Sequence, residues 1–242
     1  MLLKIGKISR RILAGLLAFF NVVPSLTVIF NPLLFTMFFP LGMYAVLTWP
    51  WPILKDIPDP FHLGESLYWL TYVIKVQDDV LLHSLFGLGF TLAAVGSAIF
   101  LAAFIKWLSS LRKGGLITRG IYRAVRHPQY FGIIVLTLGI SIRALRPVSF
   151  IAWLTLAFGY LILASVEEKG LLKTYGEKYV EYAETVPFMV PFLKLKLPGF
   201  LSPQRPYRYI LLLALWITLT IALMISTRNM VLALRGSFKT FQ

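Results

Sequence analysis

The sequence has no cysteine, few histidines and little charge. Its 242 residues include 0 Cys and 3 His, and only 14% are charged, about half the share of a soluble domain. Without cysteine, disulfides, thiolate metal sites and cysteine nucleophiles are excluded. The three histidines lie in three regions, so no metal site is predicted. Low charge in a chain that is 58% apolar, with mean hydropathy +0.76, excludes a disordered chain and argues against a soluble enzyme.

The few charges are mostly positive. There are 24 Lys and Arg against 10 Asp and Glu, a formal net charge of +14. Nucleic-acid binding is one explanation of such a surplus. The basic residues lie in short stretches between apolar runs, however, and this pattern favours a membrane protein without a nucleic-acid partner.

Several apolar runs approach the roughly 20 residues that cross a hydrocarbon core. The four clearest are residues 80–105, 129–142, 148–166 and 209–226. The middle two predict a helical hairpin, because only a short turn containing Arg143, Arg146 and Pro147 separates them. The first arm of this hairpin is short for a full crossing.

The apolar residues 12–49 are too many for one span, since a single helix would be about 57 Å long at ~1.5 Å per residue. We expect Pro24, Asn31-Pro32 and Pro40 to divide them. The sequence therefore predicts an all-α polytopic membrane protein with about five to six transmembrane helices, including the hairpin at 129–166. We divide it into three parts: N-terminal helices and an outer loop (1–79), a core with the functional site (80–200), and a C-terminal helix and tail (201–242).

The basic residues also predict an orientation. Residues 106–126 carry six positive and no acidic side chains, whereas residues 50–79 carry two lysines against five acidic residues. By the positive-inside rule, residues 106–126 and 169–208 lie in the cytoplasm. Residues 50–79 lie outside. Two N-terminal topologies remain open. The basic N-terminus lies outside if residues 12–49 form a two-helix hairpin, or along the cytoplasmic interface if only one helix crosses.

Polar side chains gather at the predicted cytoplasmic ends of two spans. In the first group, Pro128 biases His127 away from helical backbone, so a helix begins at Pro128. Arg126 and His127 then lie at the positive end of that helix, where anionic or oxygen-rich groups bind. The alternative is a membrane-anchoring belt, in which arginine snorkels and tyrosine lies at headgroup level.

The second group begins with Glu167 and Glu168, directly after an apolar run. Carboxylates facing lipid are costly, so they should face a cavity, water or a cation. Because neighbouring helix positions differ by about 100°, one carboxylate points into a site while the other meets Arg126, Arg123 or solvent. The alternative is a stop-transfer end with solvated charges. Three tyrosines after this pair are expected to form one face of a helix: Tyr175, Tyr179 and Tyr182.

Small residues interrupt the first clear span at Gly87, Gly89 and Gly96. They allow another helix or a ligand to approach the backbone closely. We favour helix packing as their use.

The two polar groups combine into one extended pattern over residues 80–192. It reads Leu116-Ile117-Thr118-x-Gly120-x-Tyr122-x-x-x-Arg126-His127-Pro128-x-Tyr130-x-Gly132, then Glu167-Glu168-x-x-Leu171-x-x-x-Tyr175-Gly176-x-x-Tyr179-x-x-Tyr182 and Val186-Pro187. This pattern resembles the integral-membrane methyltransferases of the isoprenylcysteine carboxyl methyltransferase and phospholipid methyltransferase group.

The resemblance implies methyl transfer from S-adenosylmethionine, at the cytoplasmic face of a membrane, to a lipophilic or small acceptor bearing a carboxylate, thiol or amine. It implies Glu167 and Arg126 as catalytic residues. It also implies that Gly87 and Gly89 match a Gly-x-Gly of the phospholipid branch. The implied cofactor-binding residues are Leu116, Ile117 and Tyr122 at the adenosyl group, His127, Pro128, Gln129 and Tyr130 at the polar end, and Glu167 with Glu168 from the hairpin.

One position departs from the group. Members that act on prenylated cysteine use an arginine one helical turn before the paired glutamates to bind the substrate carboxylate, and Leu163 stands there. A prenylcysteine substrate is therefore not indicated, unless Arg143, Arg146 or Arg123 substitutes. A lipid, an isoprenoid-like molecule and a small thiol remain open as acceptors.

Two other functions are compatible with the sequence. One is a membrane reductase related to the sterol reductases, with a nicotinamide cofactor, and the other is a non-catalytic membrane protein in which both motifs anchor helix ends. For a methyltransferase, we expect His127→Ala and Glu167→Gln to weaken cofactor binding at least tenfold. Glu168→Gln should cost less if Glu168 mainly faces solvent.

Overall fold

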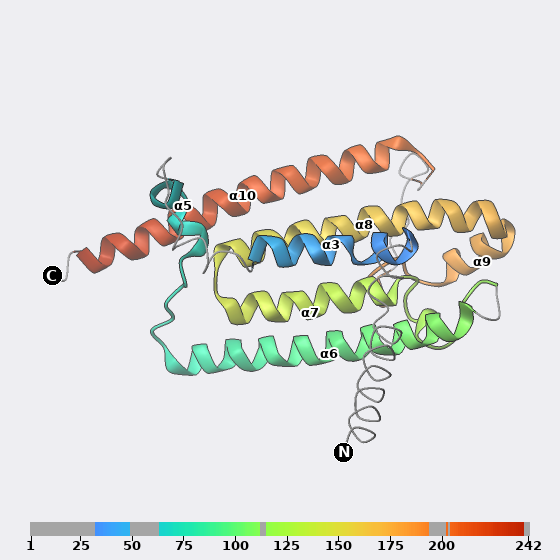
Figure 1. The fold of residues 1–242 in the computed structure, drawn as a ribbon, viewed down its shortest axis with the longest axis horizontal. Coiled ribbons are helices and arrows are strands. Elements are labelled where there is room, and N and C mark those ends of the chain that lie inside the picture. The colour runs from blue at the N-terminus through green and yellow to red at the C-terminus, as the bar shows by residue number, and fades with distance from the viewer. Residues whose placement is uncertain (1–31, 49–62, 112–114, 194–201, 203, 240–242) are drawn as a thin grey trace, which may run out of the picture. The chain divides into compact units, whose positions relative to one another are not determined.

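The computed structural model describes residues 32–48, 63–111, 115–193, 202 and 204–239, and within these ranges all regular structure is helical. The chain divides into two compact units, Met1–Phe39 and Pro40–Gln242. The helices, shown in Figure 1, are α3 (Pro32–Thr48), α5 (Leu63–Thr71), α6 (Asp79–Leu111), the short 3₁₀ helix η1 (Gly120–Arg123), α7 (Pro128–Ala144), α8 (Pro147–Tyr175), α9 (Glu177–Thr185) and α10 (Pro206–Lys239).

Three of these helices are long and apolar enough to cross a membrane: α6, α8 and α10. Only 6% of the most apolar part of α10 is buried inside the protein, against 44% of that of α8. An apolar helix with so little protein around it requires lipid to cover its side chains. Shorter apolar helices occupy Phe35–Thr48 and Pro128–Ala144. The predicted all-α polytopic membrane fold is confirmed.

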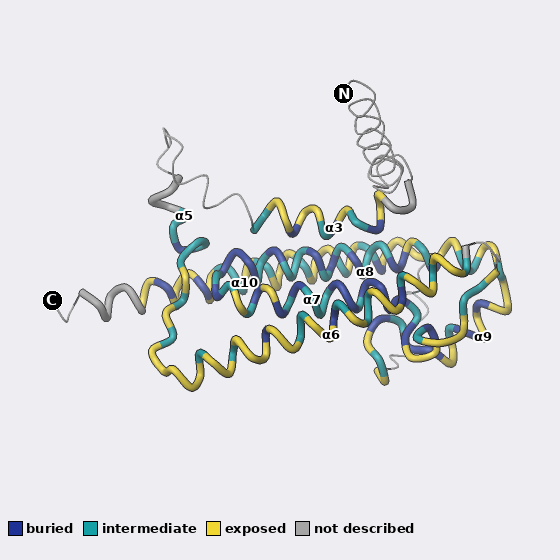
Figure 2. The backbone as a smooth tube through the Cα atoms, turned by 60° about the horizontal axis from the view of Figure 1, so that its bottom comes forward, coloured by how far each residue is buried: buried dark blue, intermediate teal, exposed yellow. Residues whose placement is uncertain are grey.

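The predicted hairpin is present as α7 and α8. Leu145, with φ 48°, makes the turn, and each helix begins with a proline in its first turn. Buried residues follow both helices, whereas exposed residues dominate α6 (Figure 2). The hairpin therefore forms the interior of this part of the chain.

Helix α8 continues beyond the expected end at residue 166, so that the paired glutamates lie inside a helix. It stops at Gly176, whose φ of +54° and ψ of −128° break the helical path. Tyr175 therefore belongs to α8, while Tyr179 and Tyr182 belong to α9. The expectation of one continuous tyrosine face is wrong because glycine ends the helix between them.

Glycines bring the backbones of α6 and α7 together. A Cβ at Gly132 would lie 2.6 Å from the Phe100 nitrogen, and one at Gly89 would lie 2.8 Å from the Gly139 oxygen. A Cβ at Gly96 would overlap the backbone of Leu136 in the same way. Helix packing is thus the use of Gly89 and Gly96, because the Cβ position of each is occupied by atoms of α7. At Gly87 nothing lies within 4 Å of a Cβ.

Pro40 does not end a helix as expected, because α3 continues through it to Thr48. Packing in the second unit stabilises this part of α3: a Cβ at Gly159 of α8 would lie 3.2 Å from Pro40 Cβ. The Tyr44 hydroxyl lies 3.0 Å from Ser141 Oγ of α7. Helix α3 begins at Pro32, one of the predicted divisions. Pro24, the open N-terminal topology and His62 lie outside the described residues.

Candidate functional site

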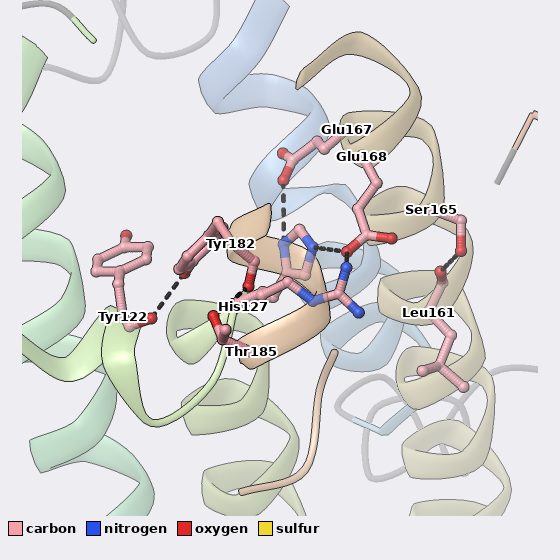
Figure 3. Close-up of polar contacts among 9 residues, drawn as sticks. Tyr122, His127, Leu161, Ser165, Glu167, Glu168, Tyr182 and Thr185 are labelled. Atoms are coloured by element: carbon pink, nitrogen blue, oxygen red, sulfur yellow. Dashed lines mark hydrogen bonds and ion pairs between the residues drawn. The ribbon is translucent and has the colours of Figure 1, made fainter. Parts of the chain in front are cut away.

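The loop between η1 and α7 carries Arg126 and His127 and is fastened by segments from later in the chain. The backbone nitrogen of Arg126 donates to the Pro187 oxygen at 2.9 Å. The Tyr182 hydroxyl donates to the Tyr122 backbone oxygen at 2.7 Å (Figure 3). These bonds hold the loop against α9 and the segment after it, where the loop faces α8.

The paired glutamates of α8 face this loop. Arg126 Nη1 lies 2.5 Å from Glu168 Oε1. The two ring nitrogens of His127 lie between the carboxylates, with Nδ1 3.5 Å from Glu167 Oε2 and Nε2 3.6 Å from Glu168 Oε1 (Figure 3). Residues about 40 positions apart in the sequence thus form one cluster of two cationic and two acidic side chains.

The two glutamates differ in exposure. The side chain of Glu168 is 3% exposed and that of Glu167 is 38% exposed. The condition under which Glu168→Gln would cost less, that Glu168 mainly faces solvent, is therefore not met: α8 turns Glu168 inward against Arg126, one of the partners that the sequence left open. Glu167 lies at the open edge of the cluster and accepts a hydrogen bond from the Tyr130 hydroxyl.

Aromatic rings enclose His127. Its ring stacks on Tyr130 with centroids 5.7 Å apart, and Tyr130 in turn stacks on Tyr160 at 4.8 Å. Phe188, from the segment after α9, meets the His127 ring edge-on at 5.4 Å. These contacts leave the imidazole only 5% exposed and fix its orientation.

Burial and neighbouring charge control protonation around the loop. Burial alone lowers the pKa of His127, but its contacts with Glu167 and Glu168 outweigh this, and the pKa lies above its ordinary value. Burial raises the pKa of Tyr182 to about 12 and also raises the pKa values of Tyr122 and Tyr179. The three phenols therefore remain hydrogen-bond donors at neutral pH.

Two buried polar atoms in this cluster lack hydrogen-bond partners, Tyr122 Oη and Arg126 Nε. Buried polar atoms are normally satisfied, so these two indicate that a polar ligand or water completes the site. Phenol, guanidinium and imidazole groups suit hydroxyl, amino and carboxylate groups of a ligand, and therefore fit S-adenosylmethionine.

The structure brings together most of the predicted site residues. Arg126, His127, Tyr130, Glu167 and Glu168 are linked by the contacts above. Tyr122 is buried beside them, and Pro128 and Gln129 are buried in the first turn of α7.

Two of the predicted adenosyl residues lie before η1. Leu116 packs against the apolar cluster of Tyr179, Tyr182 and Val186, so it adjoins the loop through α9. Ile117 is half-buried in the same segment.

Sequence reasoning missed Phe188 and Arg208. Phe188 contacts the His127 ring of the cluster. The guanidinium carbon of Arg208 lies 4.7 Å from the Phe188 ring centroid. The available signal was weak, namely an aromatic residue directly after Val186-Pro187 and an arginine in the first turn of an otherwise apolar helix.

Comparison with known proteins matches the part of the chain that holds most of this cluster. The family model described as phospholipid methyltransferase matches residues 82–178. Protein-S-isoprenylcysteine O-methyltransferase B of Arabidopsis thaliana is 35% identical over 79 residues, which are 32% of this chain and 40% of that protein. Protein-S-isoprenylcysteine O-methyltransferase of Homo sapiens is 32% identical over 80 residues, 33% of this chain and 28% of that protein. The chain thus spans less than half the length of these relatives. No solved structure matches it.

Proposed function

We propose that the protein is a membrane methyltransferase, because residues 82–178 match the phospholipid methyltransferase family model and are similar to part of the isoprenylcysteine methyltransferases. Its methyl donor is S-adenosylmethionine and its acceptor is lipophilic. The reaction takes place at the cytoplasmic ends of α7 and α8.

The observation that carries this proposal is the buried cluster of Arg126, His127, Glu167 and Glu168 with its unsatisfied polar atoms. A solvated stop-transfer end does not explain it, because Glu168 is 3% exposed. A membrane-anchoring belt does not explain it either, because His127 is 5% exposed and lies between two carboxylates.

The residues present suit the parts of such a cofactor. Tyr122, Tyr179 and the apolar surface near Leu116 would hold the adenosyl group. His127 and Arg126 Nε would donate to the carboxylate, and Glu167, at the open edge, would bind the amino group or ribose. When bound, S-adenosylmethionine supplies a methyl group on a positively charged sulfur, which departs as a neutral sulfide.

The chain's own contribution to catalysis is orientation and exclusion of water. The rings of Tyr130 and Phe188 pack on the imidazole, with Tyr160 stacked behind Tyr130, and keep water from the cluster. Glu167 favours positive charge at the open edge of the cluster. Glu168 balances the charge of Arg126, so Arg126 acts here by holding the loop and by hydrogen bonding to the cofactor rather than by proton transfer. An amine or hydroxyl acceptor would need a base, and His127 would serve as one only in its neutral form, which its raised pKa disfavours.

Titration of the purified chain in detergent with S-adenosylmethionine and, separately, with NADPH tests the proposal. We expect saturable binding of S-adenosylmethionine alone, weakened at least tenfold, equivalent to about 1.4 kcal/mol, by His127→Ala. Arg123→Gln, an exposed basic residue of the same region, should bind like wild type. Binding of NADPH alone would indicate a reductase, and binding of neither would indicate a non-catalytic protein.

A further inference from the structure

Tyr160 is a fully buried tyrosine in the middle of α8, and its hydroxyl and its ring contact two different helices. The hydroxyl is hydrogen-bonded to the backbone of Leu41 in α3. The ring stacks on Tyr130 of α7, with centroids 4.8 Å apart and an interplanar angle of 24°. One side chain of α8 therefore joins α3 to the first turn of α7.

The contact with α3 lies beside Pro40, which is inside that helix. Proline interrupts the helical hydrogen bonds around it, so backbone groups next to it can bond to a side chain of another helix. The two helices are close here, since a Cβ at Gly159 would lie 3.2 Å from Pro40 Cβ. Because a buried phenol without a partner is costly, the bond to Leu41 fixes where the Tyr160 hydroxyl lies.

From Tyr130 the contacts continue into the candidate site. The Tyr130 hydroxyl donates a hydrogen bond to Glu167, and the rings of Tyr130 and His127 stack with their planes 5° apart. Tyr130 and Tyr160 are both buried, and close-packed interiors transmit displacements between neighbouring side chains. A shift of the Tyr160 ring would therefore reach the hydroxyl that holds Glu167.

Glu167 needs such support because its side chain is 38% exposed. An exposed glutamate samples several rotamers, and fixing one of them before the ligand arrives lowers the entropic cost of binding. We propose that Tyr160 is a positioning residue that acts through Tyr130 to keep Glu167 oriented toward the ligand, with α3 as its anchor. This inference rests on the proposed function. It extends the support of the site to Leu41, which lies outside the segment 82–178 that the family model matches.

A double-mutant cycle on S-adenosylmethionine binding to the full chain in detergent tests the proposal. Tyr160→Phe keeps the ring and removes the hydroxyl that bonds to Leu41. Tyr130→Phe keeps the stack and removes the hydroxyl that bonds to Glu167. We expect each change to weaken binding about fivefold, the worth of one hydrogen bond. The double variant should bind no more weakly than Tyr130→Phe alone, because Tyr160 acts through the Tyr130 hydroxyl.

The rate at which Glu167 reacts with a water-soluble carbodiimide, followed by mass spectrometry, is a second readout that needs no ligand. Tyr160→Phe and Tyr130→Phe should each make Glu167 react about threefold faster, because losing a hydrogen bond leaves its carboxylate less restrained. Tyr44→Phe is the matched control, since it removes a phenol hydroxyl of α3 that lies 3.0 Å from Ser141 Oγ, near the other end of α7. It should leave both readouts as in wild type. Thermal unfolding measures the cost of each variant to stability separately.

Non-additive losses of affinity, together with faster reaction of Glu167, support the inference. Additive losses in the double variant would overturn it, as would unchanged binding or an unchanged Glu167 reaction rate in Tyr160→Phe. Equal effects of Tyr44→Phe would also overturn it, because Tyr160 would then only support the packing of α3. A wild-type chain that does not bind S-adenosylmethionine contradicts the proposed function, and the reaction rate of Glu167 then decides by itself whether Tyr160 positions this carboxylate.

Discussion

At the residue scale, the two neighbouring glutamates have separate tasks. Glu168 is buried and paired with Arg126, whereas Glu167 is 38% exposed and bonded to Tyr130. Removing one partner of a buried ion pair leaves the other charged group without compensation. We therefore assign stability mainly to Glu168 and ligand binding mainly to Glu167.

Glu168→Gln should lower the free energy of unfolding by about 3 to 5 kcal/mol, because the charge of Arg126 remains buried without its partner. Glu167→Gln, at a more exposed position, should lower it by less than about 1 kcal/mol. The same Glu167→Gln change should weaken S-adenosylmethionine binding at least tenfold. Thermal unfolding in detergent and calorimetric titration measure both effects. Equal losses of stability in the two variants would contradict this division.

His127 should make stability depend on pH. Its carboxylate contacts outweigh burial and raise the pKa of the folded state. The charged imidazole therefore stabilises the fold fully below the unfolded-state pKa of about 6.5, and this contribution is lost as the pH rises through the higher folded-state pKa. The difference in melting temperature between wild type and His127→Gln should shrink as the pH is raised above about 6.5. A constant difference would show that the imidazole is neutral throughout.

At the element scale, glycine determines how closely α6 and α7 pack. Gly89 and Gly96 of α6 face Gly139 and Leu136 of α7, and a side chain at either glycine would meet backbone atoms. Backbone cannot rotate away as a side chain can, so the helices themselves would have to separate. The position of α7 matters for function because its first turn holds the buried Gln129 and Tyr130.

Gly96→Ala should destabilise the protein by about 1 to 3 kcal/mol, the usual cost of overpacking. Gly87→Ala is the matched control on the same helix, since nothing lies within 4 Å of a Cβ there. It should change stability by less than about 0.5 kcal/mol. Both values come from thermal unfolding in detergent. If the Gly87 variant loses S-adenosylmethionine binding without losing stability, Gly87 contributes to the cofactor site.

At the scale of the whole molecule, the apolar residues lie mainly in the long helices, and the polar residues gather at one site. The helices α6, α8 and α10 are long and apolar enough to cross a membrane, while the polar cluster lies where η1, α7, α8, α9 and the start of α10 meet. For the proposed methyltransferase, this arrangement would let a lipophilic acceptor reach the cluster from the bilayer and a charged cofactor reach it from water.

Site-directed labelling should establish the orientation, since a chain with no native cysteine requires no background substitutions. Lys173→Cys near the site end of α8 and Gln77→Cys just before α6 are both at exposed positions. With a membrane-impermeant maleimide on intact cells, we expect Gln77→Cys to be labelled. Lys173→Cys should be labelled only after the cells are permeabilised. The reverse pattern would place the site outside.

The sequence by itself determined the membrane class, the hairpin and most of the polar cluster, because apolar run length and local proline chemistry are encoded in neighbouring residues. It also predicted that a helix begins at Pro128, which α7 does. Tertiary structure decided which glutamate faces Arg126, that α3 continues through Pro40, and that Gly89 packs on α7. It also brought Phe188 and Arg208 to the site. Each of these depends on contacts between distant segments, whose geometry no local pattern in the sequence specifies.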